Sequence, residues 1–151
     1  MYEFVDRPVT TLDRGGRFLI WSLRSWVASM AQEECPARTI APAFARWKMI
    51  GGLQPFHRTM LLLNRDALER LQFCSLHCNH VSEHEAIFLC LVRQIGTRHI
   101  AQVRDTLALL IEEESVGDLL AGLCELTDRM NDAAILPGPP SEAGPVAPRH
   151  I

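Results

Sequence analysis

Hydrophobic residues recur at helical spacing along most of the chain, and this pattern predicts an all-α fold. No run of alternating apolar and polar residues is long enough to predict a sheet. We therefore expect a single-domain bundle of five or six helices. The predicted helices cover residues 13–32, 39–51, 55–72, 82–96, 98–113 and 115–134.

The fourth predicted helix has the clearest boundaries. Ser82 and Glu85 form an S-x-x-E capping box, in which each side chain binds a backbone N–H of the first turn. Gly96 stands at the position where glycine commonly ends a helix. The body of this helix is apolar all round, as in a central helix that others cover on every side.

The boundaries around the third predicted helix are less clear. Gly51-Gly52 is expected to end or bend the second helix, and Pro55 to begin the third, since proline fits a first turn. Asp66-x-x-Glu69 also matches the start of a separate short helix. Whether residues 55–72 form one helix or two therefore stays open.

A change in composition predicts three regions along the chain. Residues 1–12 are expected to form an N-terminal arm, and residues 13–134 the helical domain. Residues 135–151 contain five of the nine prolines and no apolar periodicity. Such a Pro/Gly-rich segment is typical of a disordered, extended tail.

Composition and charge exclude several classes of protein. Of the 151 residues, 48% are apolar and 22% charged, which excludes a chain that is disordered throughout. The net charge of −3 is unlike that of a general nucleic-acid binder. All basic residues except Lys48 are arginine, which we attribute to a GC-rich bacterial genome. Residues 1–75 are net basic and residues 76–151 net acidic, a gradient that favours contact between copies or between halves of the fold.

Neither the first residues nor the cysteine content suggests export. The first residues lack the basic and apolar segments of a signal peptide. The longest apolar runs, 60–63 and 86–92, are far shorter than the roughly 20 residues that span a bilayer. Five cysteines, an odd number, argue against a disulfide framework. We therefore expect a cytoplasmic protein without a membrane partner.

One cluster of cysteine and histidine carries candidate metal chemistry. Residues 74–84 read CSLHCNHVSEH, so five of eleven positions carry thiol or imidazole groups. Four such ligands in tetrahedral geometry form a structural zinc site. Zinc is therefore the candidate cofactor, with ligands drawn from Cys74, His77, Cys78, His80 and His84.

The same cluster also has a structural interpretation. Cysteines are often small buried residues, and the histidines fit polar loop or capping positions. No second pair of Cys or His follows at the longer spacing that zinc sites usually show. A redox pair is favoured less than zinc, because the C-x3-C motif of Cys74 and Cys78 has no preceding strand.

A second, weaker candidate is an anion site near the start of the third predicted helix. Arg46, His57 and Arg58, together with Lys48, are basic groups close to the helix N-terminus, where backbone N–H groups attract anions. The alternative is that these long side chains lie on the surface beside a buried Trp47. Nucleic-acid binding is not expected, because the apolar run at 60–63 would be a costly face for a DNA groove.

These observations lead to two functional hypotheses. Nucleotide-binding glycine motifs are missing, and H-E-x-x-H fails at Phe88, so no catalytic residue is predicted. The leading hypothesis is a non-enzymatic helical binding or interaction protein that self-associates, since the first and fourth helices are apolar over more than one face. The alternative is a small zinc-type sensor or enzyme with its site at the Cys74–His84 link.

Overall fold

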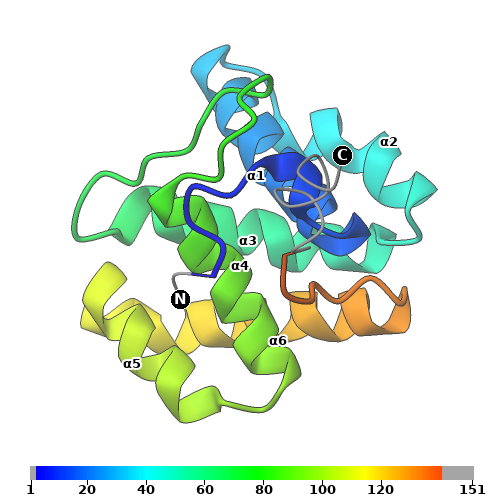
Figure 1. The fold of residues 1–151 in the computed structure, drawn as a ribbon. Coiled ribbons are helices and arrows are strands. Elements are labelled where there is room, and N and C mark those ends of the chain that lie inside the picture. The colour runs from blue at the N-terminus through cyan, green and yellow to red at the C-terminus, as the bar shows by residue number, and fades with distance from the viewer. Residues whose placement is uncertain (1–2, 141–151) are drawn as a thin grey trace.

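The computed structural model describes residues 3–140 and is all-helical (Figure 1). Within these residues there are no strands, only two isolated bridges, Pro8 with His80 and Ala67 with Ile111. None of the described helices is both long and apolar enough to cross a membrane. The six α-helices are α1 (Arg14–Ala31), α2 (Pro36–Arg46), α3 (Ile50–Asp66), α4 (Glu83–Gly96), α5 (Ile100–Leu110) and α6 (Val116–Asp132).

The predicted helix starts agree best with the structure where a side chain caps the first turn. At α1, the carboxylate of Asp13 accepts a hydrogen bond from the Gly16 N–H at 2.9 Å. At α4, both hydrogen bonds of the Ser82–Glu85 capping box are present. Each cap satisfies N–H groups that have no partner inside the helix, which is why these sequence signals fix the boundary.

The boundary between α2 and α3 differs from the prediction. Lys48 takes a left-handed backbone conformation (φ 60°) after α2 ends, and α3 begins already at Ile50. Gly51 and Gly52 therefore lie in the first turn of α3, where a Cβ on Gly51 would come within 3.3 Å of the Arg129 side chain on α6. Their small size serves close packing rather than helix termination.

The rest of α3 settles the question left open by the sequence. Pro55 lies inside α3 instead of beginning it. The helix ends at Asp66, and residues 67–82 contain no helix, so 55–72 hold one helix and an extended segment. We call residues 67–82, which join α3 to α4, the link.

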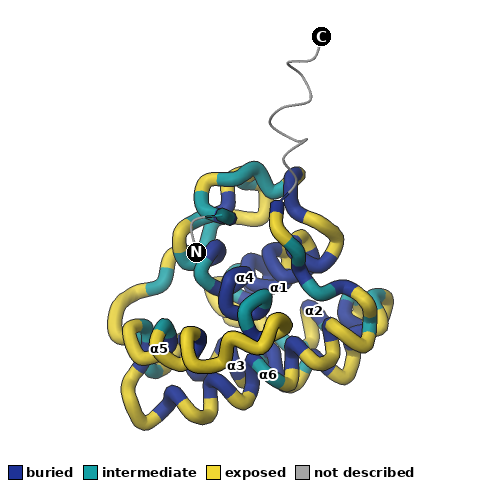
Figure 2. The backbone as a smooth tube through the Cα atoms, turned by 60° about the horizontal axis from the view of Figure 1, so that its bottom comes forward, coloured by how far each residue is buried: buried dark blue, intermediate teal, exposed yellow. Residues whose placement is uncertain are grey.

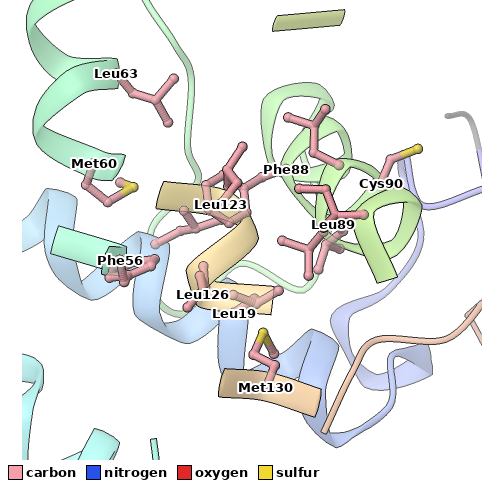
Figure 3. Close-up of a cluster of buried hydrophobic side chains, with 14 of the residues drawn as sticks. Leu19, Phe56, Met60, Leu63, Phe88, Leu89, Cys90, Leu123, Leu126 and Met130 are labelled. Atoms are coloured by element: carbon pink, nitrogen blue, oxygen red, sulfur yellow. The ribbon is translucent and has the colours of Figure 1, made fainter. Parts of the chain in front are cut away.

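The core gathers around α4, which packs against α1, α5 and α6. Figure 2 shows α4 buried along most of its length, as its apolar composition predicts. In Figure 3, Phe88 and Leu89 of α4 face Leu123 of α6 within a cluster that α1 and α3 complete. The apolar excess of α4 is thus covered within one chain, so it no longer supports self-association.

Both ends of the described chain pack onto the helices. The N-terminal segment pairs with the link, because Asp6 N–H donates to the Val81 carbonyl and Val81 N–H to the Arg7 carbonyl, each at 2.9 Å. Residues 3–12 are therefore part of the fold rather than a separate arm. At the other end, Ile135 is buried so close to α1 that a Cβ at Gly15 would overlap its carbonyl oxygen.

The packed chain thus continues beyond the predicted boundary at residue 134. Asp13 holds this continuation as well, since its carboxylate accepts a hydrogen bond from the Gly138 N–H at 2.8 Å. Pro137 and Pro140 are also buried. The remainder of the predicted tail, residues 141–151, lies outside the described residues.

Candidate functional site

A buried ion pair between α1 and α4 organises the candidate site. Arg24 donates from Nε to Glu85 Oε2 at 2.8 Å and from Nη2 to Glu85 Oε1 at 3.0 Å. The two side chains are 2% and 0% exposed. This two-point geometry is the strongest that an arginine and a carboxylate form. Although burial lowers the pKa of Arg24, the hydrogen bond and charge of Glu85 outweigh it and raise that pKa, so the guanidinium stays charged.

The same pair also holds the backbone of the link. Arg24 donates to the carbonyl of Cys78 at 2.6 Å and to that of His80 at 2.8 Å. Glu85 accepts from the N–H of Cys74 at 3.0 Å and from that of Ser82 at 2.9 Å. Residues 74–82 are therefore wrapped around one buried charge pair, whose hydrogen-bonding groups are nearly all used.

Sequence reasoning recognised only half of this arrangement. Glu85 was predicted as a helix cap, and that role is confirmed. Arg24 was missed, although it is the only charged residue between positions 18 and 32. A single arginine inside an apolar helix is itself a signal, since charged side chains are almost never buried without a partner.

The five predicted metal ligands are not gathered into one site. Cys74 and Cys78 lie beside each other, but His77 and His80 are exposed. His84 turns to another part of the link, where its Nδ1 accepts from the Gln72 N–H at 2.7 Å. In the described part of the chain, no three Cys, His, Asp or Glu side chains come together as they would to hold a metal ion. A closed zinc site needs four ligands, and only two of the predicted ones are adjacent.

The predicted anion site is also divided among different surfaces. Because α3 begins at Ile50, His57 and Arg58 lie past its first turn, away from the N–H groups that would bind an anion. His57 Nδ1 instead accepts a hydrogen bond from Trp26 Nε1 at 2.9 Å. Arg58 pairs with Glu125 of α6 at 3.0 Å, and Arg46 ends α2 as an exposed residue. His57 and Arg58 are thus engaged with different partners, on α1 and on α6.

An open cleft of about 480 Å³ lies between α1, α3 and the first half of the link. Its exposed edge carries Asn64, Leu68, Glu69 and Arg70. This combination of an apolar interior with a few polar groups at the edge is typical of binding sites. The interior is lined by buried or half-buried apolar side chains, namely Trp26, Val27, Met60, Leu63, Leu71 and Phe73.

One wall of the cleft separates it from a narrow apolar cavity. Leu63, Leu71 and Phe73 line both spaces, and the second one reaches between α4, α5 and α6. The cleft is therefore walled by side chains with free space on both sides. Such a wall can adjust its rotamers to an occupant more easily than a close-packed core can.

Comparisons with known proteins found no matching family model, no matching curated protein and no matching solved structure. The two half-buried histidines each use Nδ1 in a structural hydrogen bond, His57 with Trp26 and His84 with Gln72. What the surface offers is an apolar hollow edged by opposite charges, and that arrangement suits binding.

Proposed function

We propose that this chain is a non-enzymatic helical interaction protein that self-associates through the cleft between α1, α3 and the link. The observation that carries this proposal is the cleft itself, a hollow of about 480 Å³ on the molecular surface that is lined mostly by apolar side chains. Apolar surface of this kind gains free energy when a partner excludes water from it. A cytoplasmic location remains part of the proposal, in keeping with five unpaired cysteines.

A second copy of the chain is the occupant that the edge of the cleft favours. Leu68 is 53% exposed at that edge, so a projecting apolar side chain stands beside an apolar hollow. A two-fold dimer needs one surface that complements itself. In such a dimer, Leu68 of each copy enters the cleft of the other.

The charges at the edge fit the same arrangement. Glu69 and Arg70 are adjacent, exposed and oppositely charged. Around a two-fold axis, Glu69 of one copy faces Arg70 of the other, and the reverse pair forms at the same time. Opposite charges placed in this way guide orientation more than they add affinity.

The mass of the protein in solution tests this function. Light scattering at micromolar concentration is expected to give twice the chain mass of 17.0 kDa. Leu68→Glu should reduce it to the monomer mass, because it places a charge in the apolar hollow. Ile50→Glu is the matched control, since Ile50 is similarly exposed (57%) but lies at the other end of α3.

Two results would contradict the proposal. A wild-type mass near 17.0 kDa at micromolar concentration would rule out self-association. A Leu68→Glu protein that stays dimeric would rule out the cleft as the interface. Elemental analysis of the same samples addresses the zinc alternative, which requires near-stoichiometric metal in protein purified without added metal.

A further inference from the structure

The second half of the link brings two thiols together in a tight turn. The Cys78 N–H donates to the Ser75 carbonyl at 3.1 Å, so the chain reverses between these residues. The Cys78 thiol consequently lies beside the Cys74 thiol, close enough to contribute to raising its pKa. A disulfide bond requires the two Cα atoms to lie within about 7 Å, and this turn places the two cysteines on either side of one short reversal of the chain.

The buried ion pair fixes both cysteines through their backbones. Glu85 accepts from the Cys74 N–H, and Arg24 donates to the Cys78 carbonyl. The Arg24 charge also interacts with both sulfur atoms, since each contributes to raising the pKa of Arg24. The guanidinium therefore lies near both sulfur atoms, and the Cys78 thiol donates to the His80 carbonyl at 3.6 Å, so the same pair positions both thiols.

Both cysteines are half-buried, but their surroundings differ. Cys78 lines a surface pocket of about 250 Å³ together with Arg17, Trp21 and His77. Cys74 does not line this pocket, and burial raises the pKa of its thiol, as do neighbouring Cys78 and Glu85. Cys78 is therefore the thiol that a small oxidant in this pocket reaches, and Cys74 takes the role of the second thiol.

We infer that Cys74 and Cys78 form a redox site that a hydroperoxide converts into an intrachain disulfide. The Cys78 thiolate attacks one peroxide oxygen, the O–O bond breaks, and the departing oxygen leaves as water after taking up a proton. The resulting Cys78 sulfenic acid is attacked by the Cys74 sulfur, which forms the S–S bond and releases the second water. Two thiols and one hydrogen peroxide thus give one disulfide and two waters, and an external thiol reverses the change.

The other cysteines lack the features that mark this pair. Cys35 is exposed at the start of α2, Cys90 is buried in α4 and Cys124 is half-buried in α6. They therefore serve as internal references within one molecule. Reversible pairs of this kind also fit a reducing compartment, where cytosolic disulfides are usually transient or redox-sensing.

The test uses the full-length chain, reduced, freed of reductant and treated with equimolar hydrogen peroxide. Two of the five thiols should be lost, and the intact mass should fall by about 2 Da, the mass of two hydrogens. After denaturation and alkylation, proteolytic cleavage at Leu76 should leave Cys74 and Cys78 in two fragments that separate only on reduction. Because this mapping uses the wild-type chain, it does not depend on whether any variant folds.

Variants then assign the two roles. Cys74→Ser should leave a sulfenic acid at Cys78 that a sulfenic-acid probe labels, whereas Cys78→Ser should abolish the fast loss of thiols. Cys35→Ser and Cys124→Ser are the matched controls and should still lose two thiols. The inference is overturned if Cys74 and Cys78 both remain free to alkylate after treatment, or if the lost thiols map to Cys35 bridges between copies. None of these readouts depends on dimer formation, so they can fail or succeed independently of the proposed function.

Discussion

The two halves of the link between α3 and α4 are held by different forces. Residues 74–82 are anchored by hydrogen bonds to the Arg24–Glu85 pair and by backbone pairing with the N-terminal segment. Residues 67–73 have fewer such bonds, among them that from the Leu68 N–H to the Leu110 carbonyl at 2.8 Å. Their Leu71 and Phe73 side chains are instead partly buried and pack against the edge of the core.

This difference separates a fixed region from an adaptable one. Directional hydrogen bonds to a buried charge pair define one conformation, because any other leaves charged groups without partners. Partial apolar packing beside free space sets weaker limits on side-chain position. The anchored half accordingly carries the thiol pair, and the adaptable half forms the wall of the proposed interface.

Removing Glu85 tests the anchored half most directly and has the largest expected effect. Glu85→Ala should lower the free energy of unfolding by roughly 3–5 kcal/mol, because it leaves the buried Arg24 guanidinium without its counter-charge. The Cys74 and Ser82 N–H groups lose their acceptor at the same time. Urea unfolding followed by circular dichroism measures the change.

Glu125→Ala is the control for this variant, since it removes the same side chain from an exposed pair. Arg58 and Glu125 are 45% and 56% exposed, so solvent screens their attraction. Removing one partner of such a pair should cost about 0–1 kcal/mol. Equal losses in the two variants would show that the Arg24–Glu85 pair does not anchor the link.

Sequence could predict the local half of this site but not its long-range half. The capping box at Ser82 and Glu85 depends on residues three apart, and it placed the start of α4 correctly. The partner of Glu85 is Arg24, 61 residues away, and their meeting depends on how α1 packs against α4. The six helices were therefore predictable as elements, whereas the path of the link was not.

The same limit explains the other differences. Gly51-Gly52 has a low helix propensity, but the close packing of α3 against α6 outweighs it. The Cys/His cluster could be recognised in the sequence from its composition. Whether its side chains meet at one site depends on the path that the link takes in the fold. That path turns His84 toward Gln72 and leaves Cys74 with Cys78 alone.

A second variant tests the adaptable half directly. Phe73→Ala should lower the free energy of unfolding by about 1–2 kcal/mol, less than the roughly 3–5 kcal/mol of a fully buried phenylalanine, because Phe73 is half-buried beside free space. Leu76→Ala, in the anchored half and 45% exposed, is the control and should cost under about 0.5 kcal/mol. A Phe73→Ala loss as large as that of Glu85→Ala would mean that the wall of the cleft is as rigidly held as the Arg24–Glu85 pair.

The smallest expected effect is a pH dependence of the free energy of unfolding that comes from His57, beside the cleft. His57 accepts a hydrogen bond from Trp26, which lines the cleft, and burial lowers the pKa of His57 below its ordinary value of 6.5. As the pH falls through 6.5, the unfolded chain therefore binds a proton that the folded chain resists. The free energy of unfolding should decline on acidification, by less than in either variant above.

Unfolding curves recorded at about pH 7.5 and about pH 5.5 measure this decline across the range in which histidine titrates. His57→Asn is the informative variant, because its side-chain oxygen can still accept from Trp26 Nε1 but does not titrate. It should show a shallower decline than the wild-type chain. The anchored half contributes no such decline through Arg24, since the pKa of that guanidinium is raised and it stays charged throughout. If the free energy of unfolding of His57→Asn declines as steeply on acidification as that of the wild-type chain, the acid sensitivity does not come from His57. The two halves of the link would then not differ in their response to pH.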